Sequence, residues 1–456
     1  MKISCNFGLF ATEKFFSRLI SLAIPISLYS MLLSSRNIID VVMLSQIGST
    51  EVASMGVALR GIMIGNLFLF SICSCGAIFT AQYSGASNKS GVRQATALTA
   101  IFCLPLSFIV ALNYYFFSKE IMGFASSNHE VIKIGSDYLK ITCISMLAIS
   151  ISGIFSAGLR SIGQASIATG FNALGIILNI ILNYILIFGN LGFPALGVEG
   201  AAWGTVLSAI IECIAVIIFI YGRGHILSFN IRDILEAKKE KIKTFYKICI
   251  PLSINSLMWP SSLFIYHSII GNISTDALAA MAMITPVETY SMAIMMGVAT
   301  AASIMQGNIL GKKKFQQAYY QAWIFVIINI LLAIVVSLIL FFIKPWILSI
   351  SPNLNEEMLS YLDDFYNILL IGILIKSAGI AMVIGVLRAS GDTKFCMNQD
   401  IICQWVFGIP LTIIAAYWLE WSAVYIYACM LLEEVAKLLF SIKRLRSKSW
   451  LKSIIN

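Results

Sequence analysis

Charged side chains are scarce in this sequence: Asp, Glu, Lys and Arg make up 12% of its 456 residues, about half the fraction of a soluble domain. A glycine-rich phosphate loop of the GxxxxGK type is missing, so we expect no ATP hydrolysis by this chain. The histidines His129, His225 and His267 are far apart, and the ten cysteines form no Cys-x-x-Cys pair. Zinc sites, disulfides, bound cofactors and enzymatic activity are therefore not expected.

The sequence consists instead mainly of long apolar stretches. Hydrophobic residues make up 59% of the chain, and mean hydropathy is +0.88. They fall into about 12 continuous runs of the length that crosses a bilayer as a helix. Because these runs do not alternate as barrel strands do, and the first is too long for a cleavable signal peptide, we predict an all-α membrane protein. The runs are 18–45, 54–83, 95–117, 134–158, 168–189, 197–222, 248–270, 278–307, 321–343, 361–386, 398–418 and 421–441.

An internal repeat divides the chain. The turn GLRSIGQAS (Gly158 to Ser166) returns as VLRASGDTK (Val386 to Lys394), about half a chain length later. The openings LAIPISLYSML and ICIPLSINSLM match in the same order. We therefore predict 12 transmembrane helices in two six-helix lobes, related by a pseudo-twofold axis along the membrane normal. The predicted parts are the lobe 1–222, a cytosolic linker 223–247, the lobe 248–442 and a basic tail 443–456.

The net charge of +9 is unevenly distributed. With both termini in the cytosol, cytosolic segments hold about 23 Lys and Arg and external loops about three (Lys119, Lys133 and Lys344). This asymmetry favours a multi-pass protein of the plasma (inner) membrane with cytosolic termini. We interpret the basic linker and tail as topology signals that touch anionic lipid rather than as a nucleic-acid site.

Ionisable residues within apolar runs are the candidates for function, because each one is costly in lipid. Asp40 lies in the first run, and its buried carboxylate could hold or release a proton as its environment changes. Arg36 lies one turn earlier and could form a static salt bridge with Asp40 instead. Asn179 and Asn183, four apart in the fifth run, could line a polar cavity or hydrogen-bond between helices.

The second half offers Glu288 and Lys376 as its lone deep charges, which would be a gated or an inert pair if they face each other. Glu433 and Lys437, four apart in the last run, are interpreted as a structural ion pair. Asp400 would cap its helix or answer Lys394.

Several stretches give the chain a family resemblance: IPISLYSMLLSSRNIIDVVMLSQIG, GVEGAAWGTVLS and the two LR turns. Through them the sequence resembles the multidrug and toxic compound extrusion (MATE) transporters, of the bacterial type, over nearly its whole length. The resemblance implies two lobes enclosing a V-shaped cavity. It also implies antiport, with proton or sodium entry driving export of organic cations and other amphipathic compounds.

By the same resemblance, Asp40 matches a proposed coupling aspartate and Asn179 a polar position beside it. Asn183 stands where some members have aspartate, Ser256 where related proteins often have glutamate, and Ser377 where sodium-coupled members can carry aspartate. The departures in the second lobe favour a proton as the coupling ion, through the first lobe or through Glu288 and Lys376.

We therefore predict an ion-coupled antiporter that exports small organic or amphipathic molecules and acts as a monomer. A flippase for lipid-linked sugars would need a basic cavity, for which only Arg36, Arg60 and Lys376 are available. A membrane sensor without transport is a further alternative. A twelve-helix facilitator-superfamily carrier is disfavoured, because its Asp-Arg-Gly loop is replaced by SGASNKSG.

Overall fold

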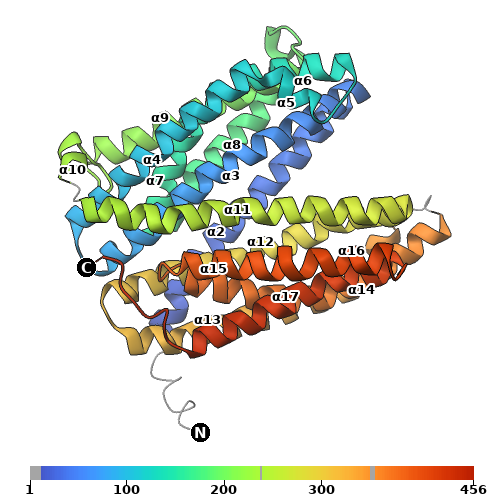
Figure 1. Ribbon diagram of the computed structural model, residues 1–456. Coiled ribbons are helices and arrows are strands. Elements are labelled where there is room, and N and C mark those ends of the chain that lie inside the picture. The colour runs from blue at the N-terminus through green and yellow to red at the C-terminus, as the bar shows by residue number, and fades with distance from the viewer. Residues whose placement is uncertain (1–11, 237–238, 350–354, 456) are drawn as a thin grey trace. The chain divides into compact units, whose positions relative to one another are not determined.

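The computed structural model describes residues 12–236, 239–349 and 355–455, and within these ranges the regular structure is helical throughout (Figure 1). Ten described helices are long and apolar enough to span a membrane. A further pair, α6 (His129–Thr142) and α7 (Ser145–Ser161), bends by 51° and qualifies jointly as an eleventh. The prediction of an all-α membrane protein is confirmed. The last predicted run is α17 (Ala423–Arg446), whose Glu433, Glu434 and Lys437 add charge to an otherwise apolar helix.

Packing divides the chain into two compact units. The N-terminal unit is Leu28–Cys249, and the C-terminal unit combines Met1–Ser27 with Ile250–Asn456. Two long helices, α2 (Glu13–Ser45) and α11 (Lys239–Ile273), therefore contribute to both units. In the C-terminal unit the start of α2 is fixed by Phe15, whose ring lies 5.2 Å from that of Phe325, and by Ser27, which donates to the Ile294 carbonyl.

The N-terminal unit places its polar side chains mainly on α2, α8 and α9. Helices α8 and α9 follow each other in the chain and pack along one another. Buried Asn and small residues line this contact, so the two backbones approach closely, as is common between membrane helices. Besides α2, α6 and α7, the helices are α3 (Ser49–Gly85), α4 (Lys89–Phe116), α5 (Ser118–Gly123), α8 (Ala165–Phe188), η1 (Asn190–Gly192), α9 (Val198–Gly222) and α10 (Ile231–Leu235).

The C-terminal unit contains two π-helical segments, η2 (Ala381–Leu387) and η3 (Ile401–Gly408), each continuous with an α-helix. Such segments widen the backbone locally and are frequent at functional sites. The other elements are α12 (Thr275–Gly311), α13 (Phe315–Ser349), α14 (Glu356–Ile380), α15 (Thr393–Asp400), α16 (Ile409–Tyr417) and α17.

The repeated turns have the same backbone geometry. Gly163 has φ +92° and Gly391 has φ +77°, in the left-handed region that glycine enters without steric cost. Gly163 N–H donates to the Arg160 carbonyl at 3.0 Å, and Gly391 N–H donates to Arg388 at 2.9 Å. The repeat read in the sequence is therefore also a repeat of local structure.

The arginines of these turns contact corresponding positions in the two halves, although the contacts differ in chemistry. Arg160 lies over the ring of Tyr29 in α2, and Arg388 donates to Asn255 in α11. Tyr29 and Asn255 occupy corresponding places in the matched openings of the two halves. Each half thus ties the end of its fourth run to its first helix.

Candidate functional site

The first polar site lies inside the N-terminal unit, where α2, α8 and α9 meet. Asp40 is 3% exposed, and its Oδ1 accepts a 2.8 Å hydrogen bond from Nδ2 of Asn183. Asn179, one turn earlier on α8, donates to the hydroxyl of Thr205 at 3.3 Å and lies 3.5 Å from Asn183 Oδ1. The four side chains form one buried network. Its hydrogen bonds replace part of the hydration that these polar groups lose on burial.

A glycine makes room for this network. Gly204 of α9 lies directly against the amide of Asn183, and any Cβ at position 204 would collide with Asn183 Oδ1. The glycine therefore lets α9 approach α8 closely enough for Asn183 to point at Asp40. Sequence reasoning missed Gly204 and Thr205, although the stretch GVEGAAWGTVLS that contains them carried part of the family resemblance.

Arg36 borders the site more loosely. Its Nε lies 3.8 Å from Asp40 Oδ2, and its Nη2 donates to Thr205 at 3.4 Å. The Arg36 side chain is 24% exposed, against 4% for Asp40. The two form a long ion pair and not a short bidentate arginine–carboxylate salt bridge. In the described part of the chain, Asp40 Oδ2 accepts no hydrogen bond.

A second feature marks the site as incomplete by itself. The buried Asn179 Oδ1 has no hydrogen-bond partner among the described residues. It is an oxygen acceptor of the Asp40 network without a donor. An unsatisfied buried acceptor is costly, and a water molecule or a small cation would satisfy it.

Two further groups surround the network. Tyr138 of α6 is buried and lies within electrostatic reach of Asp40 and Arg36. Glu212 of α9 packs against Gly175 of α8, which has no side chain to obstruct it. Glu212 is about two turns beyond Thr205, on the same face of α9. Glu212 is a charge within the sixth apolar run of the sequence, 197–222, and the packing of α8 on α9 places it near this site.

In the C-terminal unit, the structure brings Glu288 of α12 and Lys376 of α14 together. Lys376 Nζ lies 2.5 Å from Glu288 Oε1, and both side chains are about a quarter exposed. The nearby positions at which an acid might be expected hold serines bonded to backbone. Ser256 donates to the carbonyl of Leu252, and Ser377 donates to that of Asn329. This unit therefore places one ion pair where the resemblance suggested a possible acidic sodium site.

A larger charged cluster gathers around Lys437. Its Nζ lies 2.5 Å from Glu433, 3.3 Å from Glu434 and 3.9 Å from Asp400. The predicted Glu433–Lys437 pair is thus present as one part of a wider cluster. Asp400 pairs with Lys437 and accepts a hydrogen bond from Asn255, where the sequence had suggested a partner in Lys394. The cluster lies at η3, and Tyr266 donates to Glu433 beside Gly408, the last residue of η3.

Comparison with known proteins now decides the family. The model of the MatE family matches residues 25–185 and 251–414, one segment in each half of the chain. The chain belongs to the MATE family of membrane transporters. The predicted resemblance is confirmed, and with it the expectation of a transporter rather than an enzyme.

Several proteins share this family's sequence pattern with the chain. It is 24% identical to a probable multidrug resistance protein NorM of Bacillus cereus over 401 residues, 88% of each protein. It is also 24% identical to an uncharacterized transporter, YisQ, of Bacillus subtilis over 447 residues, 96% of each.

Solved structures confirm the fold. An outward-facing multidrug resistance MATE family transporter superposes with a TM-score of 0.85 at 17% identity, covering 95% of this chain and 96% of that one. A transporter of the same superfamily from Pyrococcus furiosus, described as having a binding pocket of reverse polarity, also superposes with a TM-score of 0.85 at 17% identity, covering 94% and 96%. At this identity the likeness concerns the fold alone.

Proposed function

We propose that this MATE transporter exports small organic molecules, including amphipathic cations, in exchange for an inward-moving proton or sodium ion. The relative named above as a probable multidrug resistance protein supports this substrate class. The Asp40 network supports the coupling step. A buried carboxylate with one oxygen hydrogen-bonded by Asn183 and the other left to a distant Arg36 can change its ionisation without the loss of a tight salt bridge.

The network favours a proton as the coupling ion. Among the described residues, Asp40 is the carboxylate that is hydrogen-bonded to this network, through Asn183, and Arg36 adds a positive charge at 3.8 Å. A sodium site would gain from further anionic oxygens and would be opposed by this guanidinium. In the C-terminal unit Glu288 is neutralised by Lys376 at 2.5 Å, so we assign that pair a structural or gating role.

The proposal extends to setting and assembly. The uneven distribution of Lys and Arg supports a plasma-membrane location with both termini in the cytosol. We propose two lobes joined by the basic linker 223–247, activity as a monomer, and no resident cofactor beyond the coupling ion.

Flux in reconstituted vesicles tests the proposal. Transport of a fluorescent organic cation by the purified protein would be measured under a proton gradient alone and, separately, under a sodium gradient alone. We expect export driven by the proton gradient and its loss in Asp40→Asn, with membrane insertion unchanged. Full transport by Asp40→Asn would remove this residue from the coupling step. Flux driven only by sodium would reassign the ion. Binding of the organic cation without flux under either gradient would favour the sensor alternative.

A further inference from the structure

The C-terminal tail folds back onto the C-terminal unit and borders a small, partly open cavity. After α17 the chain reverses, and Trp450 is completely buried, with its Nε1 donating to the Leu445 carbonyl at 3.1 Å. Trp450 belongs to a core cluster with Leu310, Ala318 and Ala322 of α12 and α13. The tail is therefore anchored to the unit, and the positions of its neighbouring side chains are fixed.

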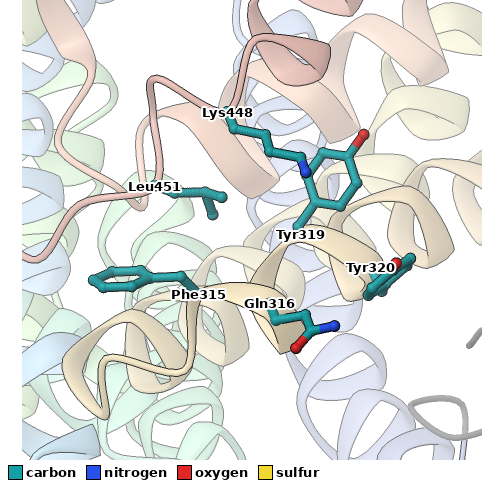
Figure 2. A pocket seen from close by; sticks show the side chains of 6 residues that line it. All are labelled: Phe315, Gln316, Tyr319, Tyr320, Lys448 and Leu451. Carbon is teal, nitrogen blue, oxygen red and sulfur yellow. The ribbon is translucent and has the colours of Figure 1, made fainter.

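The cavity lies between this tail and the first turns of α13, with a volume of about 290 Å³. Figure 2 shows Lys448 extending across the ring of Tyr319, with Leu451 and Phe315 to one side of that pair. The Lys448 Nζ lies 4.7 Å from the Tyr319 ring centroid, a cation–π distance. The lining residues are Phe315, Gln316, Tyr319, Tyr320, Lys448 and Leu451.

The charge at this corner of the unit is positive and unbalanced. Lys312, Lys313 and Lys314 immediately precede α13, and among the described residues neither they nor Lys448 form an ion pair. The neighbouring acid, Asp392, is already paired with Arg444 at 2.7 Å and with Lys452 at 3.7 Å. The cavity is suited to an anion and would repel the cations proposed as transport substrates.

The backbone gives an independent reason to regard Lys448 as selected for its amine. Lys448 is the second residue past the end of α17 and has φ +59°, a left-handed conformation that a side chain disfavours. In the other half, the second residue past the end of α9 is Gly224, with φ +56°. A glycine would serve this turn with less strain, so the lysine contributes something other than the turn.

The turn after α12 differs from its counterpart after α3 in the same way, with a lysine at the left-handed position. The second residue past the end of α12 is Lys313, with φ +57°, and the second past the end of α3 is Ser87, with φ +56°. Lys448 lines the cavity, and Lys313 lies two residues before its lining residue Phe315. The corresponding left-handed positions of the N-terminal unit hold a glycine and a serine, so lysine occupies them only in the second half.

We infer that this cavity binds the phosphate headgroup of an anionic phospholipid. It lies at the first turns of α13, a candidate membrane span from Phe315 to Leu348, and the ends of such spans lie near the lipid headgroups. Lys448 would bind the phosphate, and Phe315, Leu451 and the two tyrosines would contact the glycerol and upper acyl chain. Aromatic and basic side chains at a helix end are typical of such interfacial contacts.

The test measures lipid retention by the purified full-length protein. Native mass spectrometry would count phosphatidylglycerol and phosphatidylcholine adducts on wild type, Lys448→Gly and Lys448→Arg. Because glycine suits the left-handed turn, Lys448→Gly should fold as stably as wild type, and its circular dichroism and unfolding temperature check this. We expect a preference for phosphatidylglycerol that falls about fivefold in Lys448→Gly and is kept in Lys448→Arg.

Lys443→Gln is the matched control, because it removes one positive charge from the same end of α17 but from a residue that does not line the cavity. It should bind phosphatidylglycerol as wild type does. Equal binding by wild type and Lys448→Gly would overturn the inference, and so would an equal loss in Lys443→Gln. Inorganic phosphate that displaces the lipid at matched concentration would reassign the cavity to a soluble phosphate compound.

Discussion

Asn183 and Asp40 are 143 positions apart in the sequence and are joined by a 2.8 Å hydrogen bond inside the N-terminal unit. The amide donates to the carboxylate, and both side chains are almost completely buried. This contact links α8 to α2, so a change in the ionisation of Asp40 changes a bond between two helices. A coupling ion that binds here would therefore act on helix packing as well as on charge.

Replacing Asn183 with alanine should destabilise the protein and impair export. The buried Asp40 would lose its hydrogen-bond donor, at a cost of about 1–3 kcal/mol in the free energy of unfolding. Thermal unfolding in detergent measures the stability, and proton-driven flux measures the function. Asn113→Ala is the matched control, because Asn113 is exposed and bonds only to its own helix. Equal effects of the two substitutions would show that the contact with Asp40 has no special role.

Gly204→Ala tests the same contact from α9. The added methyl group would collide with Asn183 Oδ1 and move the amide away from Asp40. We expect export to fall at least tenfold while the protein still inserts, because a misplaced group in a coupling site is costly even when the fold survives. Gly170→Ala on α8 is the control, since a Cβ there meets no atom within 4 Å. Wild-type flux by Gly204→Ala would contradict the proposed site.

The charged clusters of the C-terminal unit should respond unequally to loss of their lysines. Lys437→Met would leave Glu433, Glu434 and Asp400 together without their shared cation, and we expect a loss of about 3–5 kcal/mol in stability. Lys376→Met should cost less, because one carboxylate is left instead of three. Unfolding temperatures compare the two variants.

The double variant Glu433→Gln with Lys437→Met decides why the stability falls. If repulsion between carboxylates is the cause, removing one negative charge should restore part of the lost stability. A double variant that is no more stable than Lys437→Met alone would assign the loss to packing of the lysine stem.

His225 should make stability depend on pH. It lies in the loop after α9, where its Nε2 donates to Gln164 Oε1 at 3.0 Å and its Nδ1 accepts from Leu227 N–H at 3.3 Å. Burial lowers the pKa of His225, so the folded protein favours the neutral ring. Because the unfolded chain binds the proton more readily, this contribution is present above the unfolded pKa and is lost as pH falls through the folded pKa.

We therefore expect wild type to lose more stability between pH 7 and pH 5 than His225→Asn, which keeps an acceptor for Leu227 but does not titrate in this range. Unfolding temperatures of both proteins at the two pH values measure the difference. Parallel losses would show that other groups carry the acid sensitivity.

The sequence predicted best where a local rule applied. Arg36 and Asp40, or Asn179 and Asn183, are four residues apart, so their placement on one helical face follows from helix geometry alone. A common turn at Gly163 and Gly391 could likewise be predicted, because the two glycines occupy the same position in the repeated motif. Asp400 shows the limit: a neighbour in sequence, Lys394, looked like its partner, but α17 supplied Lys437.

By itself the sequence determined the helical membrane class, the doubled architecture and the family. Long apolar runs, charge asymmetry and repeated motifs can be recognised from the order of residues without knowledge of tertiary contacts. Tertiary structure alone decided that Asn183 faces Asp40 through the space left by Gly204, and that Lys448 covers a cavity at α13. The physical reason is that these contacts join distant segments. Their geometry depends on how closely whole helices pack, which no local pattern encodes.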